Sequence, residues 1–272
     1  MVRSLWTAAT GMLAQQTNVD TIANNLANVN TTGYKTEVAE FKSLLYQTLQ
    51  TKTTTANGEN KPIPAQVGLG TRNSAITSIF KQGSMLASES DSAFAVDGKG
   101  FFAVRGIDGN TYYTRNGNFN MSIGTNGTAL TTSDGLPVLD SEGRAIMFDS
   151  DLSPSLITIT ADGEFCYPDE RNNPASLGIT IGVFQFTNPA GLEKTDSGLF
   201  EASAASGEAI NETTTNNPID KSRIVQGYLE GSNVQVADEM VNLIVAQRAY
   251  EMNSKAIQAS DEMMQQANQL RR

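Results

Sequence analysis

Helical and strand-like patterns occupy different parts of the chain. Apolar residues recur at spacings of three and four near both ends, which predicts amphipathic helices over about residues 4–29 and 236–269. Between them, short apolar segments alternate with Asn-Gly and Asp-Gly pairs, a pattern typical of antiparallel strands joined by tight turns. The sequence therefore predicts an α+β protein. Its terminal helices pair as a coiled coil and flank a long, turn-rich, antiparallel all-β insertion.

The N-terminal helix carries a seven-residue repeat. Its main row consists of Leu5, Met12, Val19 and Leu26. A companion row three positions further on contains Ala8, Gln15, Ile22 and Val29, so one glutamine interrupts it. Such a repeat is typical of a coiled-coil seam. Gly33 follows the helix and can take the left-handed conformation that ends helices.

The C-terminal helix carries two apolar rows on different sides. The first row is Leu243, Tyr250, Ile257 and Met264, and the second row is Val245, Ala249, Met252, Ala256, Ala259 and Met263. One partner helix can cover only one row, so we expect several neighbours, as in a multi-subunit bundle. Periodicity alone also fits ordinary two-helix packing within a soluble domain. The residues predicted to lie at subunit interfaces are Leu5, Met12, Val19, Ile22, Leu26, Leu243, Val245, Tyr250, Met252, Ile257, Met263 and Met264.

The middle of the chain divides further. Strands are predicted near residues 94–96, 101–104, 111–114, 136–139, 156–160 and 179–186, with turns at 97–98, 108–109, 116–117, 126–127, 134–135 and 162–163. The polar stretches 51–64 and 187–218 are predicted as loops. We therefore expect a helical core domain of residues 1–34 with 228–272, a connecting extension at 35–75, and a β-rich outer domain at 76–227.

Composition narrows the possible partners. The 272 residues carry a formal net charge of −10, which argues against binding the phosphate backbone of nucleic acids. The single cysteine, Cys166, lies between Phe165 and Tyr167 and is expected to be a buried small apolar residue. No secretory signal or membrane-length apolar run is visible, so the residues alone would indicate a cytosolic protein.

Catalytic chemistry finds little support. The chain has no histidine, which excludes the commonest general base and, with one cysteine, zinc sites of the Cys/His kind. Paired carboxylates among Asp97, Asp108, Asp134 and Asp162 could serve a glycosidase, but each precedes a glycine and is explained by a turn. A calcium loop at Asp108 lacks its final acidic residue. We therefore expect no enzyme, cofactor, metal or small-molecule substrate, with a carbohydrate-acting β enzyme and a calcium-binding adhesin as distant alternatives.

The two ends resemble a known family. The segment Asn24-Asn25-Leu26-Ala27-Asn28-Val29-Asn30-Thr31-Thr32-Gly33-Tyr34-Lys35 is similar to the N-terminal signature of the flagellar rod and hook proteins. Near the other end, Gly227-Tyr228-Leu229-Glu230, Ser232-Asn233-Val234 and Ala246-Gln247-Arg248-Ala249-Tyr250-Glu251 resemble the C-terminal helix region of the same family. Thr36-Glu37, Gly231 and Gln235 depart from the usual pattern without disturbing the apolar rows.

This resemblance implies a structural role and replaces the cytosolic interpretation. Family members leave the cytoplasm unfolded through the flagellar type III export apparatus without a cleaved signal peptide. They assemble helically into a hollow rod that crosses the periplasm within a bushing of ring proteins and meets the hook. Leu44-Leu45-Tyr46-Gln47 and the modest length favour the distal part of the rod, with a proximal rod or hook subunit as the alternative. The terminal helices would then be fully covered only in the assembly.

Overall fold

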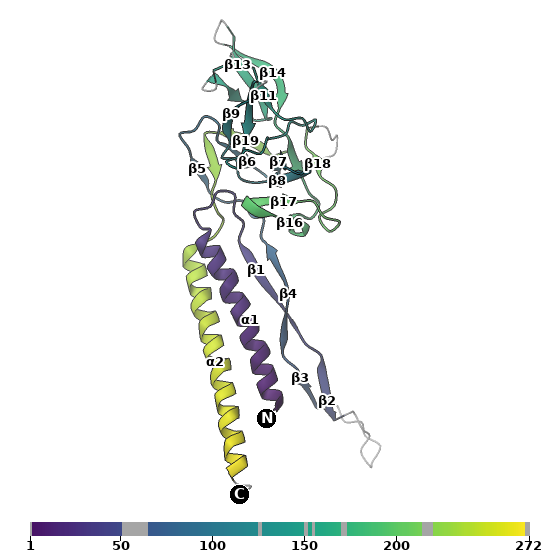
Figure 1. Cartoon of the computed structure of the whole chain (residues 1–272), viewed down its shortest axis with the longest axis vertical. Helices are drawn as coiled ribbons and strands as arrows, with labels where there is room; N and C mark the ends of the chain where they lie inside the picture. The colour runs from purple at the N-terminus through teal and green to yellow at the C-terminus, as the bar shows by residue number, and fades with distance from the viewer. Residues whose placement is uncertain are drawn as a thin grey trace. The chain divides into compact units, whose positions relative to one another are not determined.

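The computed structural model describes residues 2–50, 65–124, 127–149, 152–153, 156–169, 173–213 and 220–269. The loop predicted at 51–64, Asn126 of a predicted turn and part of the polar stretch 187–218 lie outside these residues. The chain forms two compact units, whose elements are labelled in Figure 1. Unit 1 contains Met1–Ala27, Glu37–Thr77 and Gln235–Arg272, and unit 2 contains Asn28–Thr36 and Ser78–Val234.

Unit 1 is built around two helices that lie side by side and run in opposite directions (Figure 1). Helix α1 spans Val2–Ala27 and helix α2 spans Val236–Gln269. The first helix ends two residues before the predicted position 29, because residue 28 already begins a turn in which its carbonyl accepts the amide of Thr31 at 3.2 Å. Asp238 lies in the first turn of α2, where negative charge is favourable.

Unit 1 also contains two strand pairs, most of whose residues lie in the segment 35–75 predicted as a connecting extension. Strand β1 (Glu37–Ser43) pairs with β4 (Thr71–Ser78), and β2 (Tyr46–Gln50) pairs antiparallel with β3 (Ala65–Gly68). These strands are mostly exposed on both faces. A strand without a buried face shows no apolar–polar alternation, which is why the sequence pattern did not reveal them.

Unit 2 is an antiparallel β structure, as predicted. The largest sheet has six strands, in the order β16 (Glu193–Lys194), β17 (Leu199–Glu201), β8 (Thr111–Thr114), β7 (Phe101–Arg105), β15 (Val183–Gln185) and β18 (Ile210–Asn211). Two three-stranded sheets follow the orders β11 (Met147–Phe148), β10 (Gly127–Thr131), β9 (Asn120–Gly124) and β12 (Thr158–Ile159), β13 (Glu164–Pro168), β14 (Pro174–Thr180). Two further pairs join β5 (Met85–Ala87) to β20 (Tyr228–Glu230) and β6 (Phe94–Asp97) to β19 (Arg223–Gln226). The 3-10 turns η2 (Pro189–Gly191) and η3 (Asp196–Gly198) complete it.

Strand β7 lies at the centre of the apolar core of unit 2. Its side chains alternate between two clusters of buried residues, with Phe102 and Val104 in one cluster and Phe101 and Ala103 in the other. Successive side chains of a strand point to opposite faces, so a strand buried on both faces reads as a continuous apolar run. Edge-to-face ring pairs reinforce both clusters, among them Phe102–Phe119 at 5.2 Å and Tyr113–Phe186 at 4.8 Å between ring centroids.

Some predicted strands differ in detail. Residues 136–139 form isolated bridges, including Val104 with Val138, in place of a continuous strand. The predicted run 179–186 is divided between β14 and β15 at Gly182, where a Cβ atom would lie 2.8 Å from the carbonyl oxygen of Asp140. The chain thus passes too close to its neighbour for a regular ladder at this point. Cys166 is buried, as predicted.

Candidate subunit-assembly surface

Short side chains separate α1 from α2. Ala246 of α2 is buried, and a Cβ atom on Gly11 would lie 2.9 Å from Nδ2 of Asn253. The hydroxyl oxygens of Ser4 and Ser260 are 3.2 Å apart. Small residues of this kind allow two helix backbones to approach closely. The helices therefore contact each other along their length within one chain.

The structure divides the predicted interface residues into two groups. Ile22 is buried, and seven others are half-buried: Leu5, Met12, Val19, Leu26, Leu243, Ile257 and Met264. Tyr250 is 43% exposed, whereas Val245, Met252 and Met263 are 62%, 66% and 50% exposed. Within one chain, most side chains of the first α2 row are therefore half-buried. The large side chains of the second row remain exposed to solvent. Their contact with other subunits stays a prediction.

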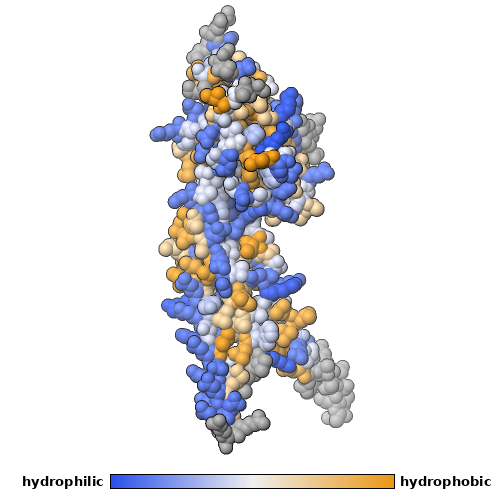
Figure 2. Space-filling view, in the orientation of Figure 1, coloured by the Kyte–Doolittle hydropathy of each residue, from blue (hydrophilic) through white to orange (hydrophobic). Residues whose placement is uncertain are grey.

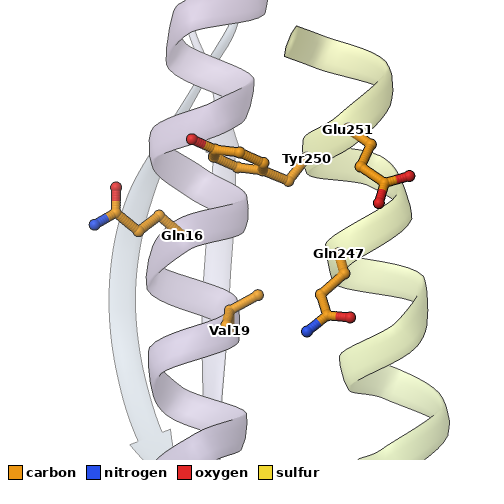
Figure 3. A pocket seen from close by; sticks show the side chains of 5 residues that line it. All are labelled: Gln16, Val19, Gln247, Tyr250 and Glu251. Carbon is orange, nitrogen blue, oxygen red and sulfur yellow. The ribbon is translucent and has the colours of Figure 1, made fainter. Parts of the chain in front are cut away.

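A groove of about 400 Å³ opens between the helices; its lining residues are Gln16, Val19, Gln247, Tyr250 and Glu251. In Figure 3 the ring of Tyr250 extends from α2 toward α1, and Val19 points from α1 toward α2. Glu251 points away from α1 in the same view. Tyr250 and Val19 fill the gap incompletely, so the first row is not closed within a single chain.

Further apolar side chains widen this surface beyond the predicted rows. On α1, Trp6 is 68% exposed and Leu13, one heptad later, is 66% exposed. On α2, the exposed residues include Val241 and Ile244. Figure 2 shows apolar side chains along the helical unit and on the strands β2 and β3. Exposed apolar surface of this extent is typical of protein–protein contacts. The seven-residue spacing of Trp6 and Leu13 is the signal by which sequence reasoning could have found that pair.

A buried asparagine joins three elements at one end of unit 1. The side chain of Asn25 on α1 accepts the amide of Glu37 at 2.9 Å and donates to the carbonyl of Glu37 at 2.8 Å. It also donates to Oε1 of Glu239 on α2 at 3.4 Å. Burial raises the pKa of the Glu239 carboxyl above its usual range, and Asp238 adds to the effect while the Asn25 hydrogen bond opposes it.

Unit 2 contains a buried ion triad that the sequence did not predict. The carboxylate of Glu230 pairs with the ammonium of Lys35 at 2.5 Å and with the guanidinium of Arg115 at 3.2 Å. The three side chains are at most 2% exposed. Burial lowers the pKa of Lys35 and of Arg115, and the charge of Glu230 opposes this in both cases. The guanidinium also lies 4.9 Å from the ring centroid of Phe101, in the range of a cation–π contact.

The described residues offer no site for metal chemistry. Among them, no group of three or more His, Cys, Asp or Glu side chains is placed to hold a metal ion. Asp97, Asp108, Asp134 and Asp162 are exposed. Within the same residues, neither helix contains an apolar stretch long enough to span a bilayer.

Sequence comparisons decide the family. The profile described as "Flagella basal body rod protein" matches residues 5–35, "Flagellar hook protein FlgE/F/G D1 domain" matches 95–167, and "Flagellar basal body rod FlgEFG protein C-terminal" matches 225–270. The chain is 45% identical to the "Flagellar basal-body rod protein FlgG" of Borreliella burgdorferi, with 100% of both chains covered. This chain belongs to the flagellar basal-body rod proteins.

The rod protein has other full-length relatives. It is 41% identical to the protein of the same name in Agrobacterium fabrum over 96% of this chain and 97% of that one. It is 36% identical to the corresponding Bacillus subtilis protein over 100% of both chains. The family resemblance seen in the sequence is therefore confirmed at both ends and across the middle of the chain.

Membership of this family establishes the class of function. The rod protein is a structural subunit of the distal rod in the flagellar basal body, it serves motility, and it is not an enzyme. The distal rod is favoured over the alternative axial subunits considered from the sequence. The family also implies self-assembly and association with other rod and hook components.

Proposed function

We propose that the rod protein polymerises helically into a hollow, straight shaft that transmits motor torque to the hook. The observation that supports this proposal is the uncovered second row of α2, where Val245, Met252 and Met263 are each at least half exposed. Side chains of this size are seldom left in water along one face of a helix unless a partner covers them. A second copy is the partner that a self-assembling family supplies.

In this proposal α1 and α2 pair as a coiled coil in the wall of the shaft. Residues 1–34 with 228–272 form its core, residues 35–75 connect, and residues 76–227 form the outer domain. The pairing of the helices is supported by unit 1, which contains both of them, and by the half-buried heptad positions Leu5, Met12 and Leu26 on α1. The twelve predicted interface residues would divide their contacts between the partner helix and neighbouring subunits.

A free-energy comparison favours many neighbours over one. Burying a large apolar side chain stabilises by about 1.5–3 kcal/mol, so Trp6, Leu13, Val245, Met252 and Met263 together contribute on the order of 10 kcal/mol. Association of two molecules opposes this with about 4–15 kcal/mol. A single contact between two copies is therefore weak, whereas a lattice in which each copy has several neighbours is stable. This is the behaviour expected of a polymer that forms only above a critical concentration.

Further partners follow from the position of the rod. We infer that proximal rod proteins and the hook protein bind the two ends of the shaft, and that ring proteins surround it. The chain would reach this location through the flagellar type III export apparatus. Nucleic acids and small-molecule substrates play no part in this function. The formal net charge of −10 supports the exclusion of nucleic acids.

Electron microscopy of the polymerised protein tests the proposal. We expect the purified chain to form thin, straight, hollow filaments at high concentration. Met252→Lys should raise the critical concentration at least about tenfold, because a charge would be buried against a neighbour at a cost of a few kcal/mol. The matched control is Gln258→Lys, which adds the same charge at another exposed position of α2. Wild-type chains that remain globular monomers, or equal effects of both variants, would contradict the proposal.

A further inference from the structure

Two segments next to the helices meet inside unit 2. We call them the root segments: residues 28–36, which follow α1, and residues 228–234, which precede α2. Both belong to unit 2, although the helices belong to unit 1. The amide of Gly33 donates to the carbonyl of Glu230 at 2.8 Å. Gly33 has a φ of 72°, and a Cβ atom there would lie 2.6 Å from the amide nitrogen of Asn116, so only glycine fits this approach.

The ion triad lies at this meeting point. Lys35 belongs to the first root segment and Glu230 to the second, while Arg115 follows β8 in the body of the unit. The carboxylate of Glu230 also accepts the amide of Gly83 at 2.9 Å, and Lys35 donates to the carbonyl of Lys81 at 3.0 Å. One buried anion therefore holds two buried cations and one backbone amide in fixed positions.

Asn233 makes a second connection between the root segments. Its Oδ1 accepts both the amide and the hydroxyl of Thr36, each at 2.7 Å. Its Nδ2 donates to the carbonyls of Ile79 and Lys81 at 2.9 and 3.0 Å. Thr36 and Asn233 lie within two residues of the points where the chain leaves unit 2 for β1 and for α2.

We propose that Lys35, Arg115, Glu230 and Asn233 form a clasp that fixes the spacing of the root segments before the subunit assembles. A buried ion pair adds little net stability, because desolvation offsets its attraction, yet breaking it leaves an unpaired charge in the interior. Such a group therefore selects one geometry. Every donor and acceptor of the clasp lies in unit 2, so it can close without any neighbouring copy and without the helices.

The clasp changes how the helices find each other. Residues 28–235 separate α1 from α2, and closing so long a loop costs conformational entropy. Once the root segments are joined, only the short lengths of chain beyond them separate the helices. Pairing then proceeds at a much higher effective concentration. The faster pairing of α1 with α2 during assembly rests on the function proposed above. The ordering of the root segments by the clasp does not depend on that function.

Amide hydrogen exchange on the unassembled full-length chain tests the clasp. In the wild type, the Gly33 and Thr36 amides should exchange as slowly as a core amide such as that of Leu139, which donates to the Ala103 carbonyl at 2.8 Å. Glu230→Gln should accelerate exchange at Gly33 and Thr36 by at least about 100-fold, because two cations lose their partner. The Leu139 amide should change little.

The matched control is Glu142→Gln, which removes a carboxylate from an exposed pair with Arg144 at 2.7 Å in the same unit. It should leave all three amides unchanged. If Glu230→Gln does not fold, exchange is measured in Lys35→Met, which leaves Glu230 paired with Arg115. This variant should also accelerate exchange at Gly33 and Thr36. Unprotected Gly33 and Thr36 amides in the wild type would overturn the clasp. So would an unchanged pattern in the variant, or equal acceleration at Leu139, which would mark the triad as part of global stability.

Seeded polymerisation separates this inference from the proposed function. Glu230→Gln should elongate wild-type seeds but nucleate on its own at least about tenfold more slowly, because its root segments must order during pairing. Normal unseeded nucleation would overturn the role in assembly. Wild-type protein that never polymerises would defeat the proposed function, while the exchange measurement would still decide whether the clasp exists.

Discussion

Individual buried polar residues act here as fixed points for the backbone. The side chain of Asn25 accepts a hydrogen bond from the Glu37 amide and donates one to the Glu37 carbonyl, as the backbone of a neighbouring strand would. Asn233 does the same between Thr36 and two carbonyls of unit 2. A buried amide that is fully paired fixes the position of each segment it contacts, since any shift leaves a polar group without a partner.

Glu239 provides a prediction at this scale. Because burial raises its folded-state pKa, the Glu239 carboxyl keeps its proton to a higher pH in the folded chain than in the unfolded chain. Its stabilising contribution is complete below the unfolded pKa, about 4.3, and is lost as the pH rises through the folded pKa. Glu239→Gln stays neutral and keeps an oxygen that can accept from Asn25. We expect this variant to have a higher melting temperature than wild type at neutral pH, with the difference vanishing at acid pH.

Helical circular dichroism of unassembled protein at neutral and acid pH measures this effect. Glu262→Gln, an exposed position on the same helix, serves as the control and should track the wild type at both values. A Glu239→Gln variant that melts below wild type at neutral pH would show that the charged carboxylate is the favoured form.

The burial of some of these residues can be predicted from the sequence, and that of others cannot. Cys166 could be placed in the core because Phe165 and Tyr167 flank it. The triad could not be found, because Lys35, Arg115 and Glu230 are far apart in the sequence and each looks like an ordinary surface charge. Only the fold shows that one carboxylate faces both cations. Pairings between distant residues carry no periodic signal.

Among the elements, the helices follow directly from their apolar rows. Within one chain, Leu243, Ile257 and Met264 of the first α2 row are half-buried, whereas Tyr250 of the same row is 43% exposed. The close contact near Ala246 was not predicted as such, because a buried alanine and an exposed alanine look alike in a sequence. Burial separates Ala246 from Ala256 on the same helix.

This contrast gives a prediction at the scale of the helix pair. Ala246→Leu adds side-chain volume where α1 and α2 are in contact, and overpacking of this kind destabilises by about 1–3 kcal/mol. Ala256→Leu makes the same chemical change at an exposed position and should leave the unassembled protein within about 0.5 kcal/mol of wild type. Chemical denaturation followed by the helical signal provides the comparison. Equal destabilisation by both variants would show that Ala246 is not at a close contact.

The strands show the limit of pattern reading. Those of the core of unit 2 were predicted because Phe101-Phe102-Ala103-Val104 and the Asx-Gly turns mark them clearly. Strands β1 to β4 were not, because few of their side chains are buried and nothing alternates. Between residues 136 and 139 the apolar pattern is present, yet the chain makes only isolated bridges. In this segment the path of the neighbouring backbone, and not the local sequence, determines whether a continuous strand forms.

At the scale of the whole molecule, two kinds of unit share one chain. Unit 1 has long helices with exposed apolar rows, whereas unit 2 has two aromatic clusters of its own. Units with separate cores need not unfold together. We expect unassembled protein to lose its helical signal at a lower temperature than the near-ultraviolet signal of its tyrosines, most of which lie in unit 2.

Core substitutions should separate the two transitions. Phe102→Ala removes a fully buried ring and should destabilise unit 2 by about 3–5 kcal/mol. Ile22→Ala should destabilise unit 1 by about 2–5 kcal/mol and leave the other transition in place. Calorimetry of both variants tests this. A single transition that shifts equally in both would show that the chain unfolds as one cooperative body.

Strand β7 gives unit 2 a mechanical property. Alternate side chains of β7 belong to the two buried clusters, so one continuous strand connects both clusters. If one cluster moved relative to the other, Phe101 and Phe102 would have to leave their packed positions on opposite faces of β7 at the same time. A unit packed in this way should resist shear between its two clusters, so under torsion both clusters should fail together.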